Sequence, residues 1–380
     1  MSYNKRPVKV LQIGMTRNLG GLESYLMQQF RHLDKSRVTY DFVNITSEYE
    51  IVFKDEILKS GSKIFGIVSR HVSPIRHYMQ WLNLLYQVHD EYKAIVLNSN
   101  SLAYVFPLFA AMFFRIPIRI MHSHNSGFET EMSLLRRILI IFNKILLSIS
   151  ATQLFACSEK AGRWMFGQKN FTVINNAIDC EKFRYSPERR KEIRQKMSFD
   201  DKFVLGHVGR FTYQKNHIFL IDIFAALAQK IDNATLLLIG DAVEDTSFLD
   251  EAKRKVKDYK LEERVIFAGL RTDIADLMQA MDCFLLPSHF EGLPVVGIEA
   301  QAAGLPCCFS DAVTREVQLT KELVQFISLD SVDYWIKAIE AARQIERRDT
   351  LDEMKAAGYD IKNEIEKLQR FYLSKRQVFK

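Results

Sequence analysis

Several features that mark common protein classes are scarce or absent in this sequence of 380 residues. It has only five cysteines, and they form no Cys-x-x-Cys pair and no metal-binding spacing with histidine, which argues against a disulfide framework and a zinc site. No apolar run is long enough for an ordinary membrane span, since the longest covers only residues 102–114. The N-terminus runs into an apolar strand rather than a secretory signal. We therefore expect a protein of the reducing cytoplasm.

Motifs for other ligands are also missing. The net charge is +6, but no Lys/Arg block is dense enough for a nucleic-acid arm. The sequence contains no G-x-G-x-x-G, which argues against a nicotinamide or flavin enzyme. It also contains no Asp-x-Asp and no His/Asp/Glu cluster with ligand spacing, so we expect no metal and no cofactor.

What the chain does contain is a repeated alternation of short apolar strands and longer helical patterns, typical of α/β parallel sheets covered on both faces. The alternation pauses in a polar stretch over residues 175–200 and then restarts. We therefore expect two doubly wound domains, residues 1–180 and 181–360. The last segment, residues 361–380, is expected to form a helix that packs back on the first domain. Ligands bind at the carboxyl ends of such sheets, so the motifs should fall on strand-to-helix loops.

The most informative motif spans residues 290–306, after a strand that ends near Leu286. Glu291 lies in the loop, and Glu299 follows eight positions later in the first turns of a helix. The amide groups of Gly292 and Leu293 lie between them and favour an anion such as phosphate. A single glutamate of this kind is usually only solvated, but the flanking glycines and prolines fix the backbone of the whole segment.

Basic residues follow an earlier strand in the same half of the chain. Arg210 and Lys215 flank the loop after Gly209, where two cations at a helix entry can hold a diphosphate.

Two further motifs follow strands of the first half. Gly20 and Gly21 allow close approach of the backbone to a ligand, although a glycine pair is more often only a turn. His122 and His124 end another strand and should project from the sheet edge. We favour His124 as the functional one, and the choice between the two stays open.

Together these segments resemble the retaining GT-B glycosyltransferases of family 4, and in particular bacterial capsular and exopolysaccharide enzymes. Residues 290–306 resemble the E-x7-E signature, residues 209–215 the G-R-x4-K element, and residues 20–23 the G-G-x-E loop. The resemblance implies two Rossmann-like domains facing across a cleft. It implies that Glu291 and His124 lie beside the transferred sugar, Glu299 binds the ribose, and the basic and glycine residues contact the diphosphate. Residues 173–183 resemble the V-I-x-N-G-I-D…F segment of the family, in which Ala177 departs from the usual glycine.

The resemblance implies transfer of a hexosyl or N-acetylhexosaminyl group from a nucleoside-diphosphate sugar, expected to be UDP-linked, to a hydroxyl with retention. The acceptor is expected to be a carbohydrate or lipid-linked saccharide of surface polysaccharide synthesis. A GT-B-shaped nucleotide-sugar epimerase and a sugar-nucleotide-binding regulatory protein are the alternatives. Residues 134–148 are apolar with interleaved basic residues, which fits either a buried helix with a charged edge or a helix on the inner face of the membrane.

Overall fold

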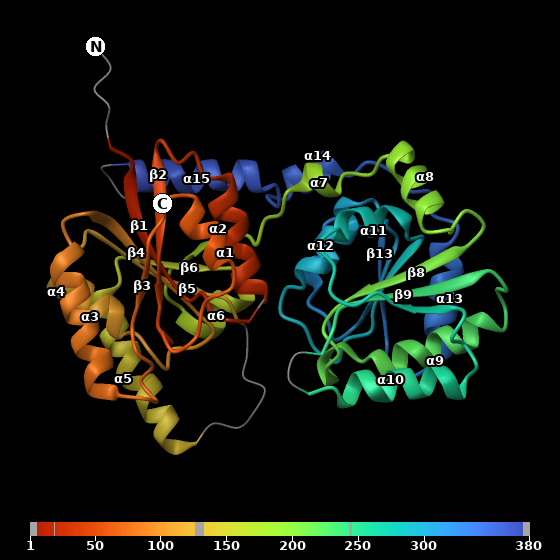
Figure 1. The fold of residues 1–380 in the computed structure, drawn as a ribbon, viewed down its shortest axis with the longest axis horizontal. Helices are drawn as coiled ribbons and strands as arrows, with labels where there is room; N and C mark the ends of the chain where they lie inside the picture. Colours follow the sequence, from red (N-terminus) through yellow and green to blue (C-terminus); the bar gives the residue numbers. More distant parts are fainter. Residues whose placement is uncertain (1–5, 19, 126–132, 243–244, 375–380) are drawn as a thin grey trace, which may run out of the picture. The chain divides into compact units, whose positions relative to one another are not determined.

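The computed structural model describes residues 6–18, 20–125, 133–242 and 245–374, and the chain divides into two compact units (Figure 1). The N-terminal unit comprises the chain up to Ala177 together with the segment from Ile361, and the C-terminal unit comprises Ile178–Asp360. Each unit contains one parallel β-sheet with helices on both faces, so the predicted α/β class with two doubly wound sheets is confirmed.

The sheet of the N-terminal unit has seven parallel strands in the order β3-β2-β1-β4-β5-β6-β7. Its strands are nearly continuous apolar runs because both faces are covered. The strands are β1 (Val8–Ile13), β2 (Val38–Asn44), β3 (Ile64–Gly66), β4 (Tyr92–Ser99), β5 (Ile118–Ser123), β6 (Gln153–Ala156) and β7 (Thr172–Val173). The helices are α1 (Gly21–His32), α2 (Lys54–Lys59), α3 (Pro74–Val88), α4 (Phe106–Phe113), α5 (Leu134–Ser150), α6 (Glu159–Phe166) and α15 (Ile361–Leu373).

Two buried clusters fill the two faces of this sheet. On one face α3, α4, α5 and α6 pack over side chains such as Leu11, Ile95 and Met121. On the other face α1, α2 and α15 pack over alternate residues such as Val10 and Phe42. The last helix, α15, therefore contributes to the core of the N-terminal unit although it ends the chain.

The sheet of the C-terminal unit has six parallel strands in the order β10-β9-β8-β11-β12-β13. The strands are β8 (Phe203–Val208), β9 (Ala234–Ile239), β10 (Val265–Phe267), β11 (Cys283–Leu286), β12 (Cys307–Ser310) and β13 (Val324–Ile327). The helices are α7 (Cys180–Phe183), α8 (Pro187–Lys196), α9 (His217–Ala228), α10 (Ser247–Asp258), α11 (Ile274–Ala280), α12 (Val295–Ala302), α13 (Val332–Ala342) and α14 (Leu351–Ala356), with 3-10 turns η1 (Tyr213–Lys215) and η2 (Arg315–Val317).

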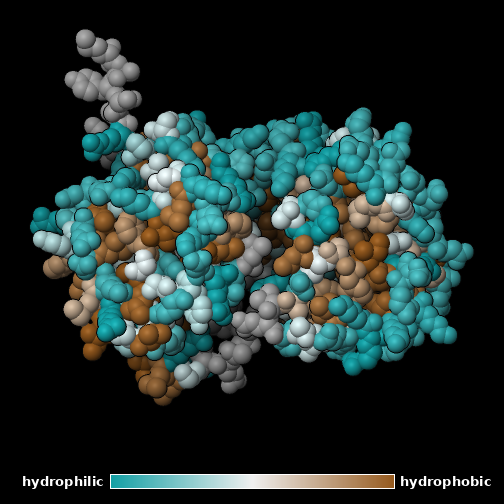
Figure 2. All heavy atoms as spheres, in the orientation of Figure 1, coloured by the Kyte–Doolittle hydropathy of each residue, from teal (hydrophilic) through white to brown (hydrophobic). Residues whose placement is uncertain are grey.

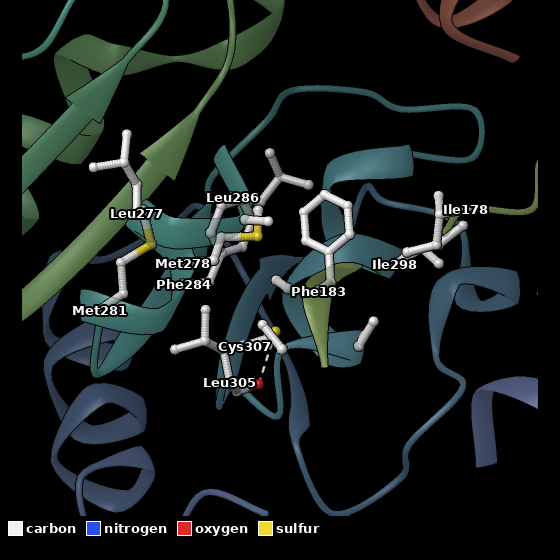
Figure 3. Close-up of a cluster of buried hydrophobic side chains, with 14 of the residues drawn as sticks. Ile178, Phe183, Leu277, Met278, Met281, Phe284, Leu286, Ile298, Leu305 and Cys307 are labelled. Carbon is white, nitrogen blue, oxygen red and sulfur yellow. Dashed lines mark hydrogen bonds between the residues drawn. The ribbon is translucent and has the colours of Figure 1, made fainter. Parts of the chain in front are cut away.

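A cluster of buried hydrophobic side chains holds α12 against this sheet (Figure 3). Ile298 of α12 packs into the same cluster as Phe284 and Leu286 of β11, together with Phe183 of α7. The five cysteines are all buried. Ile298 faces the core, whereas its neighbour Glu299 is only partly buried.

In each sheet the order in which successive strands are added reverses at one position. It lies between β1 and β4 in the N-terminal unit and between β8 and β11 in the C-terminal unit. Parallel sheets of this kind bind ligands at the carboxyl ends of the strands beside that position. The loops after β8 and β11 and those after β1, β4 and β5 therefore contain the places where a ligand site is expected.

Candidate active site

The centre of the candidate site in the C-terminal unit is an ion pair between the two predicted motifs. Nζ of Lys215, in the turn after β8, lies 2.6 Å from Oε1 of Glu291, in the loop after β11. Both side chains are largely buried, with 16% of the lysine and 8% of the glutamate side chain exposed. The strands are neighbours in the sheet, so residues 76 positions apart meet at its carboxyl edge.

Two further side chains hold the carboxylate of Glu291. Ser288 Oγ donates a hydrogen bond to Oε1 at 2.9 Å, and Gln214 Nε2 donates one to Oε2 at 3.2 Å. Gln214 also donates to the carbonyl oxygen of Phe290 at 3.0 Å, which ties the two loops together. The carboxylate thus accepts three hydrogen bonds, one of them charge-assisted, and is fixed in place before any ligand binds.

Glycines allow this close packing of the loops. At Gly240, after β9, φ is +140° and a Cβ atom would lie 2.0 Å from the carbonyl oxygen of Gly209, so only glycine fits. At Gly209 a Cβ atom would lie 3.1 Å from Cδ of Lys215 and 3.0 Å from Nε2 of the buried His207. Because Gly209 has no side chain, the side chain of Lys215 can pass close to its backbone.

The remaining predicted residues of this unit surround the ion pair. Arg210 lies just beyond Gly209, after the end of β8 at Val208, and is exposed. Gly292 and Leu293 occupy the loop between Glu291 and the start of α12 at Val295. The two cations and the entry to α12 therefore lie on strands and loops that meet at one sheet edge, which suits a diphosphate.

Glu299 lies in the second turn of α12. Desolvation raises the pKa of its carboxyl group to about 7, and Lys182 opposes this shift, although part of the residue still reaches the surface. Burial makes this carboxyl group costly to ionise in the free protein. A ligand that donates hydrogen bonds to it, such as a pair of vicinal hydroxyls, would stabilise the ionised form.

The N-terminal unit holds the two histidines at the end of β5. Asn98, at the end of β4, donates from Nδ2 to the carbonyl oxygen of Ile13 at 2.9 Å and to Oε1 of Gln12 at 3.0 Å. A backbone carbonyl only accepts hydrogen bonds, so the Asn98 atom that faces Ile13 must be the donor Nδ2. The other side-chain atom, the acceptor Oδ1, therefore faces Nε2 of His124, at 3.1 Å. Nε2 of His124 is therefore the protonated nitrogen. The other ring nitrogen, Nδ1, carries a lone pair, is buried and has no hydrogen-bond partner among the described residues.

His122 has a different environment. Only 2% of the residue is exposed, and its Nδ1 lies 3.4 Å from the hydroxyl of Tyr25. The ring centroids of the two histidines are 4.1 Å apart. Desolvation lowers the pKa of His124 to about 3, and desolvation together with His124 lowers that of His122. Both rings are therefore neutral at pH 7, and His124 is the more accessible of the two.

The glycine pair opens α1 after β1. Gly20 is the N-cap residue, where a Cβ atom would lie 2.9 Å from Oε2 of Glu23. Glu23 is itself held by the hydroxyl of Thr16, which donates to Oε1 at 2.6 Å. Gly21 is exposed and nothing lies within 4 Å of the position of its missing Cβ atom. The helix entry thus presents bare backbone, as close approach to a ligand requires.

Two other features of the structure bear on the site. A hollow of about 690 Å³ lies at the opposite, amino-terminal edge of the first sheet, lined by residues such as Val8, Tyr92 and Pro117. It is remote from the motifs, and we do not assign it a role, since α/β sheets bind ligands at the other edge. No group of three or more histidine, cysteine or acidic side chains suited to a metal occurs among the described residues.

Sequence reasoning missed three residues that support the site, Ser288, Gln214 and Asn98. Ser288 and Gln214 adjoin the predicted motifs, so their positions alone were a signal. Asn98 carried no signal, because its contact with His124 depends on the pairing of β4 with β5, in which Asn98 lies opposite His122.

Solved structures share this fold over almost the whole chain. A glycosyltransferase from Rickettsia africae superposes with a TM-score of 0.77 at 15% identity, covering 98% of this chain and all of that one. The Anabaena protein HepE, solved in complex with UDP, superposes with a TM-score of 0.70 at 19% identity, covering 97% and 96% of the two chains. The fold is therefore GT-B, as predicted.

Sequence relatives define the family. EpsF of Bacillus subtilis, which is named as a glycosyltransferase, is 31% identical over 380 residues, which is 97% of either chain. The UDP-Gal:α-D-GlcNAc-diphosphoundecaprenol α-1,3-galactosyltransferase of Escherichia coli is 22% identical over 89% of either chain. Residues 188–359 match the model of the glycosyl transferases group 1. The chain belongs to this glycosyltransferase family, which confirms the resemblance seen in its motifs.

Proposed function

We propose that this glycosyltransferase moves a hexosyl or N-acetylhexosaminyl group from a UDP-sugar to a hydroxyl of a lipid-linked saccharide, with retention, during synthesis of a surface polysaccharide. The single observation that carries the proposal is the Lys215–Glu291 pair at the carboxyl edge of the second sheet. It joins a cation suited to a diphosphate with a carboxylate suited to a sugar, at the place where such sheets bind ligands.

The proposed roles follow from the charges. As the sugar leaves, positive charge grows at its anomeric carbon and negative charge grows on the diphosphate. Lys215 has three N–H donors, so it can keep Glu291 and also bind a phosphate oxygen, while the exposed Arg210 supplies a second cation. The Gly292–Leu293 loop adds backbone amides at the entry to α12. Glu299 binds the ribose hydroxyls.

In the N-terminal unit the proposal assigns Gly20 and Gly21 to the diphosphate and His124 to the sugar. The bare Nδ1 of His124 accepts a hydrogen bond from a sugar hydroxyl, since it is a buried acceptor without a partner among the described residues. The carboxylate of Glu291 already accepts three hydrogen bonds, which makes it a poor nucleophile. We therefore assign Glu291 to positioning the sugar rather than to a covalent intermediate.

The names of related proteins support the donor and acceptor. HepE was solved with UDP-glucose, and the Escherichia coli relative is named for transfer from UDP-galactose to a lipid-linked diphosphate. A Staphylococcus aureus relative, CapM, is named for capsular polysaccharide biosynthesis and is 29% identical over 59% of this chain.

The test is a donor screen with UDP-glucose, UDP-galactose, their N-acetylamino forms and GDP-mannose, read by nucleotide release with and without bacterial lipid extract. We expect lipid-dependent UDP release with one UDP-sugar and recovery of that sugar on lipid in the α configuration. Inversion at the anomeric carbon would contradict retention. Release of no nucleotide from any donor would contradict the transferase. Exchange of deuterium at C2 without transfer would favour the epimerase.

A further inference from the structure

The surface formed by α3, α4 and α5 is unusually apolar for the outside of a protein. In α5 only Asn143, Leu147 and Ser150 are buried, so the interpretation of this segment as a buried helix is wrong. Its exposed large apolar residues, between 41% and 80% exposed, are Leu134, Leu135, Ile138, Leu139, Ile141, Phe142, Ile145 and Ile149. Figure 2 shows hydrophobic residues gathered over the protruding start of α5.

The neighbouring helices extend this surface. In α3 the exposed apolar residues are Ile75, Met79, Leu82 and Tyr86, which recur at helical spacing and form one stripe. Phe113 ends α4, which contacts both α3 and α5. Soluble monomers rarely expose apolar patches of more than a few hundred Å², and larger ones mark sites of interaction.

The charges on these helices have one sign. None of the 40 residues of α3, α4 and α5 is acidic. Arg137 and Lys144 are exposed and lie seven positions apart, so they follow one side of the apolar stripe of α5. Arg76 on α3 is also exposed. Long basic side chains beside an apolar stripe can reach lipid phosphates while their alkyl parts stay among the apolar residues.

From these observations we propose that the outer face of α3, α4 and α5 docks on the surface of an anionic lipid bilayer. No helix in the described part of the chain is long and apolar enough to cross a membrane, so α5 lies in the plane of the interface. A second copy of the chain fits less well, because a symmetric dimer on this face would bring the basic residues of both copies together. This docking is independent of which sugar is transferred.

Flotation of the full chain with vesicles tests the proposal, using phosphatidylcholine alone and phosphatidylcholine with phosphatidylglycerol, at low and high salt. We expect co-flotation with the anionic vesicles at low salt and less of it at high salt. The double variant Ile138→Glu/Ile145→Glu should abolish co-flotation. Arg137→Gln/Lys144→Gln should weaken partitioning about tenfold or more. Both positions of each pair are exposed, so cooperative melting should be preserved.

Tyr334→Glu is the matched control, since Tyr334 is an exposed apolar residue of α13 in the other unit, and it should float like the original protein. Three results would overturn the proposal. They are absence from the anionic vesicles at low salt, flotation that the Ile138→Glu/Ile145→Glu variant leaves unchanged, and sedimentation as a dimer that this variant dissociates. The last would assign the surface to a second copy of the chain.

Discussion

The ammonium nitrogen of Lys215 lies 2.6 Å from Oε1 of Glu291, and the two residues come from different motifs on neighbouring strands. A largely buried pair of this kind costs desolvation of two charges, so it is weak evidence for a stabilising role. Its position at the strand ends, with Ser288 and Gln214 on the same carboxylate, fits a group that is held ready for a ligand.

Glu291→Gln should therefore lower turnover strongly without weakening nucleotide binding. The substitution keeps the shape of the side chain but removes the negative charge, and it leaves Lys215 free for the diphosphate. We expect turnover to fall about 10²–10³-fold, the usual cost of losing one electrostatic contact to a transition state. Calorimetric titration with UDP provides the second measurement. Parallel losses of UDP affinity and turnover would assign Glu291 to the nucleotide instead.

Glu299→Gln should make the free protein more stable at high pH while weakening its nucleotide binding. Because folding raises the pKa of Glu299 from 4.5 to about 7, the folded state loses stability as the pH rises through that interval. Removing the carboxyl group should recover about 1–3 kcal/mol at pH 8 and nothing near pH 4, the upper value being reduced by partial exposure.

Thermal melts at pH 4.5, 6 and 8 test this effect, with Glu262→Gln, a substitution of an exposed glutamate, as the control. UDP affinity of Glu299→Gln should fall by about 1–3 kcal/mol because ribose hydroxyls lose an acceptor. A melting temperature that changes equally at all three pH values would contradict the shifted pKa, and unchanged UDP affinity would remove Glu299 from the ribose.

Substitution of the two histidines should separate their roles. His124→Ala should slow turnover about tenfold or more through loss of one hydrogen bond to the sugar, with UDP affinity little changed. Since its pKa is about 3, protonation of His124 should not affect turnover between pH 5 and 8. Steady-state kinetics across that range are the measurement. If His122→Ala slows turnover while His124→Ala does not, the assignment of the active-site histidine is wrong.

Asn98 should act through His124 by fixing which ring nitrogen carries the proton. In the original protein, ¹⁵N NMR of labelled histidine should show Nε2 of His124 protonated and Nδ1 bare. Asn98→Ala should give a mixture of tautomers and lower turnover about tenfold, the value of one hydrogen bond, with UDP affinity retained. The loss of a buried amide also costs stability, so a cooperative melt at the assay temperature is the control. An Nδ1-protonated His124 in the original protein would contradict this role.

The sequence was sufficient for the architecture and for the pairing of motifs at one sheet edge. Near-continuous apolar strands alternating with helices require parallel sheets, and parallel sheets gather their strand-end loops. Glu291 and Lys215 could therefore be expected near each other. The hydrogen bond from Gln214 to Glu291 could not, because it depends on the conformation of the turn at residues 213–215.

The surface of α5 shows a different limit of sequence reasoning. Its apolar periodicity predicts a helix with one apolar face, but the pattern is the same whether that face packs on a core or on something outside the chain. The structure decides between them, because Asn143 anchors the helix by donating to the carbonyl oxygen of Leu102 at 2.7 Å while Ile138 and Ile145 stay exposed.

We propose that cations of the C-terminal unit, rather than a metal, neutralise the leaving diphosphate. Lys215 is held by Glu291, and the amide groups at the entry to α12 belong to the backbone, so they can act on the diphosphate without reorganising during the reaction. The exposed Arg210 adds a second positive charge. The most direct measurement is UDP release with the preferred donor and lipid acceptor after extensive dialysis, in excess EDTA, for the original protein and Lys215→Ala. We predict full activity of the original protein in EDTA and a loss of about 10²-fold or more in Lys215→Ala. Complete loss in EDTA that magnesium or manganese restores, with Lys215→Ala unimpaired in the presence of the metal, would show that a metal and not Lys215 neutralises the diphosphate.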